Sequence, residues 1–310
     1  MAAMPICRDC FSGTLRGDAA PTGGEEVLHG LPTYVAVPGP GVEPLGAVVI
    51  IPDAFGWKLR NTRALADAYA RRIPATVYVP DFMDGETLGH APPESTMVLL
   101  ESKPAAADSW IVRRLKRAWS ILQVAPSMVS FAYNCRASLV KPRMLPFLSG
   151  VRAGADGAPG LQKLGVAGFC WGGLYATMLT HDVAENRVTA AGGREHPLVN
   201  CAFTAHPSLL SLPAHIAGVA QPLSVANGDD DEWMGRAKMQ QVVALLEAKN
   251  AQAARDVHEV VIYPGAKHGF AVRGDRDDPQ QRERGDQSED QAVSWFQRHF
   301  EAAELGVRSA

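Results

Sequence analysis

Long apolar runs and blocks of like charge are both missing from this chain of 310 residues. No window approaches the ~18 apolar residues that a membrane span requires, which argues against membrane insertion. The first residues, MAAMPICRDCFSG, do not contain the apolar core of a secretory signal. The net charge is −3 without a long run of one sign, so we expect no nucleic-acid partner. We expect a cytoplasmic protein that acts on a small molecule, with an oligomeric state that the sequence does not define.

Cysteine is also scarce, because the chain contains five, an odd number that argues against a framework of disulfides. Cys7 and Cys10 form one C-x-x-C pair, but no second pair completes a zinc site, and no strand-like run precedes them as in thioredoxin-like motifs. We therefore expect no metal and no cofactor. A redox protein that uses Cys7 and Cys10 remains an alternative, whereas Cys201, inside a strand-like run, is expected in the core.

The composition is that of a soluble globular protein, with 46% hydrophobic and 20% charged residues. Continuous apolar runs alternate with helical patterns, which is typical of a parallel sheet covered by helices on both faces. We expect one doubly wound, mostly parallel α/β domain over residues 1–310. The expected strands are 47–52, 75–80, 164–169, 199–204, 223–226 and 259–263, and the expected helices are 59–72, 174–179, 209–219, 234–248 and a last one opened by the capping box Ser288-Glu-Asp-Gln291.

Residues 84–145 interrupt this alternation with scattered prolines and no strand-like run. They include an amphipathic helical pattern, Trp110–Trp119, whose polar face carries four basic residues. Such a face is usually solvated, although a basic amphipathic helix can also lie on a membrane surface. An insertion between strands is typical of an active-site cap, so we expect a helical cap here.

The sequence GFCWGG at residues 168–173 continues directly from the third expected strand. A cysteine flanked by glycines at a junction of strand and helix indicates a nucleophile elbow, a turn too tight for larger neighbours. Amides at the start of the following helix would favour a negative charge on the Cys170 sulfur. A structural turn with a buried thiol is the alternative, and residues further along the chain are needed to decide between the two.

Two further candidates follow later strands in the order that such an elbow requires, which is nucleophile, acid and histidine. Asp231 ends an acidic turn after the fifth expected strand, and His268 lies in a turn after the sixth. Each alone could be an ordinary turn residue. Their order and placement favour a catalytic triad of Cys170, Asp231 and His268, with Asp230 as the alternative acid.

These motifs resemble the dienelactone hydrolase family, particularly its fungal members, to which the stretch 10–34 is also similar. The resemblance implies an α/β-hydrolase fold, a Cys-Asp-His triad and hydrolysis of lactones or related esters without a metal or organic cofactor. It also implies an oxyanion hole formed by the backbone amides of Ala54 and Trp171. The motifs that carry it are Pro52-Asp53-Ala-Phe55-Gly56, Gly168-Phe-Cys170-Trp-Gly172-Gly173, Gly228-Asp-Asp-Asp231 and His268-Gly269-Phe270.

The resemblance further implies roles for residues around the cysteine. Asp53 stands where well-known members have a glutamate that contacts the cysteine and gates its ionisation; a structural hydrogen bond is the alternative. Arg273 follows the histidine and would bind a substrate carboxylate. From its position alone, His206 could line the pocket or cap a helix. Three aromatic residues, Phe55, Trp57 and Trp171, could form a wall of the pocket.

We expect a cysteine-dependent hydrolase of a small lactone or carboxylic ester. The same residues could instead carry out acyl transfer or isomerisation in a fungal secondary-metabolite pathway, because water and a competing acceptor use the same triad. A non-catalytic relative that binds a small ligand is the third alternative, since a fold does not define a function. That alternative predicts that Cys170→Ala leaves the function intact.

Overall fold

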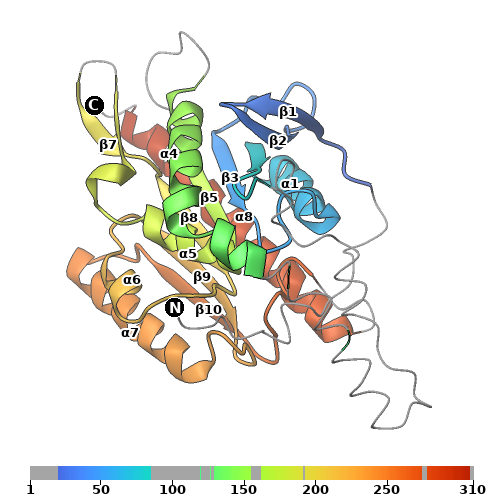
Figure 1. Ribbon diagram of the computed structural model, residues 1–310. Helices are drawn as coiled ribbons and strands as arrows, with labels where there is room; N and C mark the ends of the chain where they lie inside the picture. The colour runs from blue at the N-terminus through green and yellow to red at the C-terminus, as the bar shows by residue number, and fades with distance from the viewer. Residues whose placement is uncertain are drawn as a thin grey trace.

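The computed structural model describes residues 20–84, 119, 126, 129–154, 162–190, 193–273 and 278–307. Eight strands form one mixed sheet in the order β1-β2-β4-β3-β5-β8-β9-β10 (Figure 1). All neighbours from β4 to β10 run parallel, whereas β1 and β2 pair antiparallel with each other and β2 pairs antiparallel with β4. The strands are β1 (Gly24–Leu28), β2 (Leu31–Ala36), β3 (Ala47–Ile51), β4 (Thr76–Pro80), β5 (Leu164–Phe169), β8 (Cys201–Ala205), β9 (Leu223–Gly228) and β10 (Glu259–Tyr263).

Helices cover both faces of this sheet, as the apolar runs predicted. Val48 and Ile50 of β3 pack in one core cluster with α1 (Arg60–Arg72) and α8 (Pro279–Val307). Val49 and Ile51 face the opposite cluster with α4 (Ala137–Ala153), α5 (Trp171–Leu179) and α7 (Arg236–Ala253) (Figure 1). Because successive residues of a strand point to opposite faces, a strand buried on both sides must be apolar throughout. The doubly wound α/β architecture is confirmed.

The six predicted strands are all present with boundaries within two residues, but the strands β1 and β2 were missed. β1 is mostly exposed, so it shows no apolar alternation. The hairpin turn joins the two strands at His29 and Gly30, both of which have a positive φ. A second pair, β6 (Arg187–Thr189) with β7 (Glu195–Pro197), follows the short 3-10 helix Ala184–Asn186 and was missed for the same reason.

Four helix predictions are wrong in extent: α5 begins at Trp171 and not at 174, α7 ends at Ala253 and not at 248, and two further helices differ as follows. Within 209–219 only α6 (Ala214–Ala217) is helical, because Pro213 disfavours helical backbone at the residue before it. The last helix begins at Pro279, not at the capping box at Ser288, which lies buried inside α8. The Asp278 carboxylate accepts hydrogen bonds from the amides of Gln280 and Gln281, at 3.0 and 3.3 Å, and so caps this helix.

The interval 84–145 includes part of the helical layer. Residues 137–145 form the first half of α4, whose buried side chains, including Val140 and Met144, pack against the sheet. Trp119 is helical and 63% exposed, but the rest of the Trp110–Trp119 helix lies outside the described residues, as does most of the expected cap. None of the helices among the described residues is long and apolar enough to cross a membrane.

A buried histidine that directly precedes β10 makes the stability of the fold depend on pH. His258 Nδ1 accepts a hydrogen bond from the Leu223 amide at 3.3 Å, and burial together with Lys249 lowers the pKa of His258 from 6.5 to about 4. The unfolded chain therefore binds this proton more readily, and stability is lost as the pH falls from 6.5 through about 4. We expect thermal unfolding to show a smaller loss of Tm over this range for His258→Gln than for the wild type. Parallel profiles for the two proteins would contradict this assignment.

Candidate active site

The GFCWGG stretch forms a strained turn between β5 and α5, near the centre of the sheet (Figure 1). Cys170 has φ 51° and ψ −113°, a backbone conformation that residues with a side chain rarely adopt. A Cβ at Gly168 would lie 2.3 Å from the Gly172 carbonyl oxygen, and a Cβ at Gly172 would lie 2.0 Å from the Ile51 carbonyl oxygen. The glycines are therefore required by the close approach of the turn, α5 and the end of β3.

His268 and Asp231 form a buried pair after β10 and β9. His268 Nδ1 lies 2.9 Å from Asp231 Oδ2, and neither side chain is exposed. The other carboxylate oxygen, Oδ1, accepts the amides of Trp233 at 2.7 Å and Met234 at 3.0 Å. These three contacts fix the carboxylate, so that Nδ1 of His268 carries the proton and Nε2 is left to face away from Asp231.

The neighbouring aspartates have other surroundings. Asp230 is exposed, and Asp229 accepts the Gly265 amide at 2.6 Å and pairs with Arg236 at 2.9 Å. Asp229 therefore ties the turn after β9 to the turn after β10. Of the three acidic residues, the structure brings Asp231 to the histidine.

The charge of His268 is coupled to the cysteine. Burial on its own lowers the pKa of His268, but the negative charges of Cys170 and Asp231 raise it by more, and the pKa stands well above its ordinary value. A hydrogen bond with Cys170 contributes to the same increase, and Nε2 has no other hydrogen-bond partner within the described residues. This nitrogen is thus available for the Cys170 proton, and the imidazolium that results is stabilised by its surroundings.

Asp53 and Arg273 form a second buried ion pair beside the cysteine. Arg273 Nε lies 3.3 Å from Asp53 Oδ2, with both side chains 1% exposed, and Asp53 Oδ1 accepts the Phe55 amide at 3.0 Å. Burial raises the pKa of Asp53, Arg273 lowers it, and the charge of Cys170 raises it again, with a net increase. The Arg273 guanidinium also lies 5.0 Å from the centre of the Phe55 ring. Arg273 therefore faces Asp53 and Phe55 in the interior.

Removing one member of this pair leaves the other charge buried, which is strongly destabilising. We expect Arg273→Met to lower the free energy of unfolding by about 3–5 kcal/mol, measured by urea denaturation. The control is Arg236→Met, because Arg236 is 72% exposed in its pair with Asp229. An exposed pair contributes about 0–1 kcal/mol. Equal losses for the two variants would contradict the role given to the buried pair.

The backbone amides of Ala54 and Trp171, which are expected to form an oxyanion hole, lie on two neighbouring loops. Ala54 follows β3, Trp171 opens α5, and both share one buried cluster with Cys170. These loops approach each other so closely that a Cβ at Gly172 would lie 2.0 Å from the Ile51 carbonyl oxygen. Neither amide donates to a backbone carbonyl of the described residues. They are therefore available to a negatively charged oxygen.

His206 is placed beside His268 at the end of β8. It is fully buried, has φ 39°, and its ring centre lies 4.9 Å from that of His268 in an edge-on arrangement. Burial, followed by the charges of His268 and Arg273, lowers the pKa of His206 well below its ordinary value, so its ring is neutral. Neither of its ring nitrogens has a hydrogen-bond partner among the described residues.

The three aromatic residues expected to form a wall belong to two different core clusters. Phe55 and Trp57 lie in the cluster of α1 and α8, whereas Trp171 lies in the opposite cluster. Trp171 packs at 5.8 Å from the Phe131 ring and donates from Nε1 to the Cys135 carbonyl at 3.3 Å. The segment before α4 therefore packs against the residue that follows Cys170, and it lies within the interval 84–145 where a cap is expected. Cys201 is in the core as expected.

Ser208 was also missed. Its Oγ lies 3.7 Å from Cys170 Sγ, and its side chain is buried. The signal available in the sequence was its position shortly after the strand that neighbours β5.

Cys7 and Cys10 lie outside the described residues. Within those ranges no group of three or more His, Cys, Asp and Glu could hold a metal ion.

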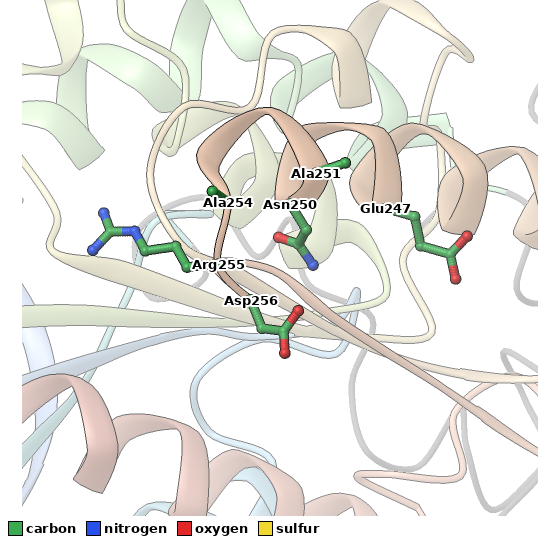
Figure 2. Close-up of a pocket in the computed structure, with 6 residues that line it drawn as sticks. All are labelled: Glu247, Asn250, Ala251, Ala254, Arg255 and Asp256. Atoms are coloured by element: carbon green, nitrogen blue, oxygen red, sulfur yellow. The ribbon is translucent and has the colours of Figure 1, made fainter.

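A surface hollow lies away from these residues, at the end of α7. Figure 2 shows its six lining residues: Glu247, Asn250, Ala251, Ala254, Arg255 and Asp256. Asn250 accepts the amides of Val257 at 2.9 Å and His258 at 2.8 Å, and donates to the His258 carbonyl at 2.8 Å. Its side chain is thus occupied in closing the loop that leads into β10. The hollow lies at the amino end of β10, whereas Cys170, Asp231 and His268 all follow the carboxyl ends of their strands.

The sheet order, the strained Cys170 turn and the Asp231–His268 pair define the class as the α/β-hydrolase fold. A solved structure from Klebsiella pneumoniae subsp. pneumoniae, titled as a dienelactone hydrolase, agrees with this fold at a TM-score of 0.55. The two sequences are 19% identical, and the match covers 89% of this chain and 98% of the Klebsiella chain.

In sequence, the model of the dienelactone hydrolase family matches residues 151–300 of this chain. Hydrolase pyvD of Aspergillus violaceofuscus is 24% identical over 305 residues, which cover 97% of this chain and 99% of that protein. Dienlactone hydrolase 1 of Gibberella moniliformis is 23% identical over 278 residues, which cover 89% of this chain and 87% of that protein. The resemblance expected from the sequence is confirmed, and the relatives are named as hydrolases.

Proposed function

We propose that this protein hydrolyses a small lactone or carboxylic ester with Cys170 as nucleophile, His268 as general base and Asp231 as the residue that orients His268. The observation that carries the proposal is the buried 2.9 Å contact between His268 and Asp231, in a site that couples His268 to the charge of Cys170. A structural turn at GFCWGG would not need a histidine held in this way.

The reaction proceeds by two displacements at one carbonyl carbon. His268 Nε2 takes the Cys170 proton, and the sulfur bonds to the carbonyl carbon, whose oxygen becomes negative and accepts hydrogen bonds from the amides of Ala54 and Trp171. The carbon–oxygen bond to the leaving group then breaks, and that oxygen takes the proton from His268. Water attacks the thioester with His268 again as base, and the acid leaves as the sulfur regains its proton.

The charged groups beside the cysteine tune this reaction. The N-terminus of α5 favours negative charge on the sulfur, whereas the Asp53 carboxylate opposes it. Arg273 offsets Asp53, so the pair gates ionisation of Cys170. Neutral His206 lies beside His268, with the two ring centres 4.9 Å apart. Every step uses the chain's own residues, and the substrate is a small molecule.

The test is turnover of a panel of p-nitrophenyl acetate and small lactones before and after iodoacetamide, with intact mass identifying the labelled cysteine. We expect labelling of Cys170 alone to abolish turnover. Unchanged turnover after complete labelling of Cys170 would overturn the proposal and favour a non-catalytic site. Product analysis with an added alcohol or amine separates hydrolysis from acyl transfer, because transfer yields a new ester or amide and hydrolysis yields the free acid.

A further inference from the structure

The turn after β8 is joined to the nucleophile by its backbone. The Cys170 amide donates to the Ala205 carbonyl at 3.3 Å, and the Ser208 amide donates to the Cys170 carbonyl at 2.9 Å. The His206 amide donates to the Ala226 carbonyl of β9 at 2.8 Å, which fixes the other side of the turn. Ser208 is therefore held in place relative to Cys170 independently of its side chain.

The side chain of Ser208 points at the sulfur from this fixed position. Ser208 Oγ lies 3.7 Å from Cys170 Sγ, within the range of hydrogen bonds that involve sulfur, and the residue is 3% exposed. A hydroxyl can turn about its C–O bond, so it accepts a hydrogen bond from a thiol and donates one to a thiolate. A buried hydroxyl at this position can therefore form a hydrogen bond with Cys170 both as a thiol and as a thiolate. A carbonyl oxygen can only accept, so it could form a hydrogen bond with the thiol alone.

We propose that Ser208 is a positioning residue that holds the Cys170 sulfur and donates a hydrogen bond to its thiolate. This inference rests on the proposed function of Cys170 as nucleophile. The need for a donor follows from the surroundings of the sulfur, because the coupling between Cys170 and Asp53 disfavours negative charge on both groups at once. A hydrogen bond to a charged acceptor is roughly twice as strong as one between neutral groups. Ser208 thereby supplements the stabilisation provided by the start of α5.

The test measures the rate of Cys170 alkylation by iodoacetamide between pH 5 and 10, followed by mass spectrometry, for isosteric variants at position 208. Ser208→Thr keeps the hydroxyl and Ser208→Val replaces it with a methyl group, while both add the same bulk. We expect the apparent pKa of alkylation to be higher by about one unit in Ser208→Val than in Ser208→Thr, with about tenfold slower alkylation at neutral pH. On an ester that the wild type hydrolyses, kcat should fall and KM should stay within about twofold.

The matched control is Ser224→Ala, which removes a buried hydroxyl on β9 that contacts Glu259 of β10 and Gln291 of α8. Its alkylation profile should follow that of the wild type. Equal apparent pKa values in folded Ser208→Val and Ser208→Thr would overturn the inference. Ser208→Ala provides the same comparison with the wild type if the larger side chains prevent folding. Alkylation needs no turnover, so a failure of the proposed hydrolysis would appear separately, as activity that survives Cys170→Ala.

Discussion

We expect Cys170→Ala to lower kcat/KM for the wild-type ester substrates by about 10⁴-fold, because the substitution removes the sulfur on which the proposed acyl intermediate forms. The fold should survive, since alanine keeps the Cβ in the strained turn and the side chain is small. The quantity to measure is hydrolysis of p-nitrophenyl acetate at neutral pH, with Tm as a check on folding.

The matched control for this loss is Cys201→Ala. Cys201 is fully buried in β8, and burial raises its pKa far above the ordinary thiol value, so it stays a neutral core residue. We expect this variant to retain turnover within about twofold, because the thiol has no access to substrate. Turnover that survives in Cys170→Ala, or is lost in Cys201→Ala at unchanged Tm, would contradict the assignment.

We expect Asp231→Asn to lower kcat by about 10³–10⁴-fold, the magnitude seen when a catalytic triad loses its carboxylate. The carboxylate stabilises the imidazolium of His268 and fixes which ring nitrogen carries the proton. An asparagine removes the charge and can present its amide N–H to Nδ1, which selects the wrong tautomer. The measurement is kcat for the same ester between pH 6 and 9.

Asp230→Asn makes the same chemical change one residue earlier and serves as the control. Asp230 is exposed, and its amide donates to the Ala266 carbonyl at 3.3 Å through the backbone, which the substitution leaves in place. We expect kcat within about twofold of the wild type. A larger loss in Asp230→Asn than in Asp231→Asn would show that the acid has been assigned to the wrong residue.

The parts of the site that sequence could predict have local chemical signatures. The glycines at 168 and 172 indicate a tight turn. The turns that contain Asp231 and His268 follow apolar runs, in the order that a nucleophile elbow requires. Those same runs predicted the buried parallel strands, because a strand covered on both faces has few polar positions. Motifs at strand ends therefore indicated which residues the fold would gather at the carboxyl edge of the sheet.

The remainder depends on contacts that no local pattern specifies. Ser208 reaches Cys170 because β5 and β8 pair in register, with Phe169 opposite Ala205. Asp53 and Arg273 were each noted separately, but their pairing joins residues far apart in sequence. The start of α8 was misplaced because Ser288 matches a capping pattern as well as Asp278 does. The exposed strand β1 has no apolar alternation to find.

The most direct measurement of the central claim is acid quenching during the first turnover of p-nitrophenyl acetate, followed by intact mass and peptide mapping. The account predicts one acetyl group, located on the peptide that contains Cys170, and no such adduct in Cys170→Ala. An acetyl group on another residue of the active wild type, or turnover without any acetylated intermediate, would contradict Cys170 as the nucleophile.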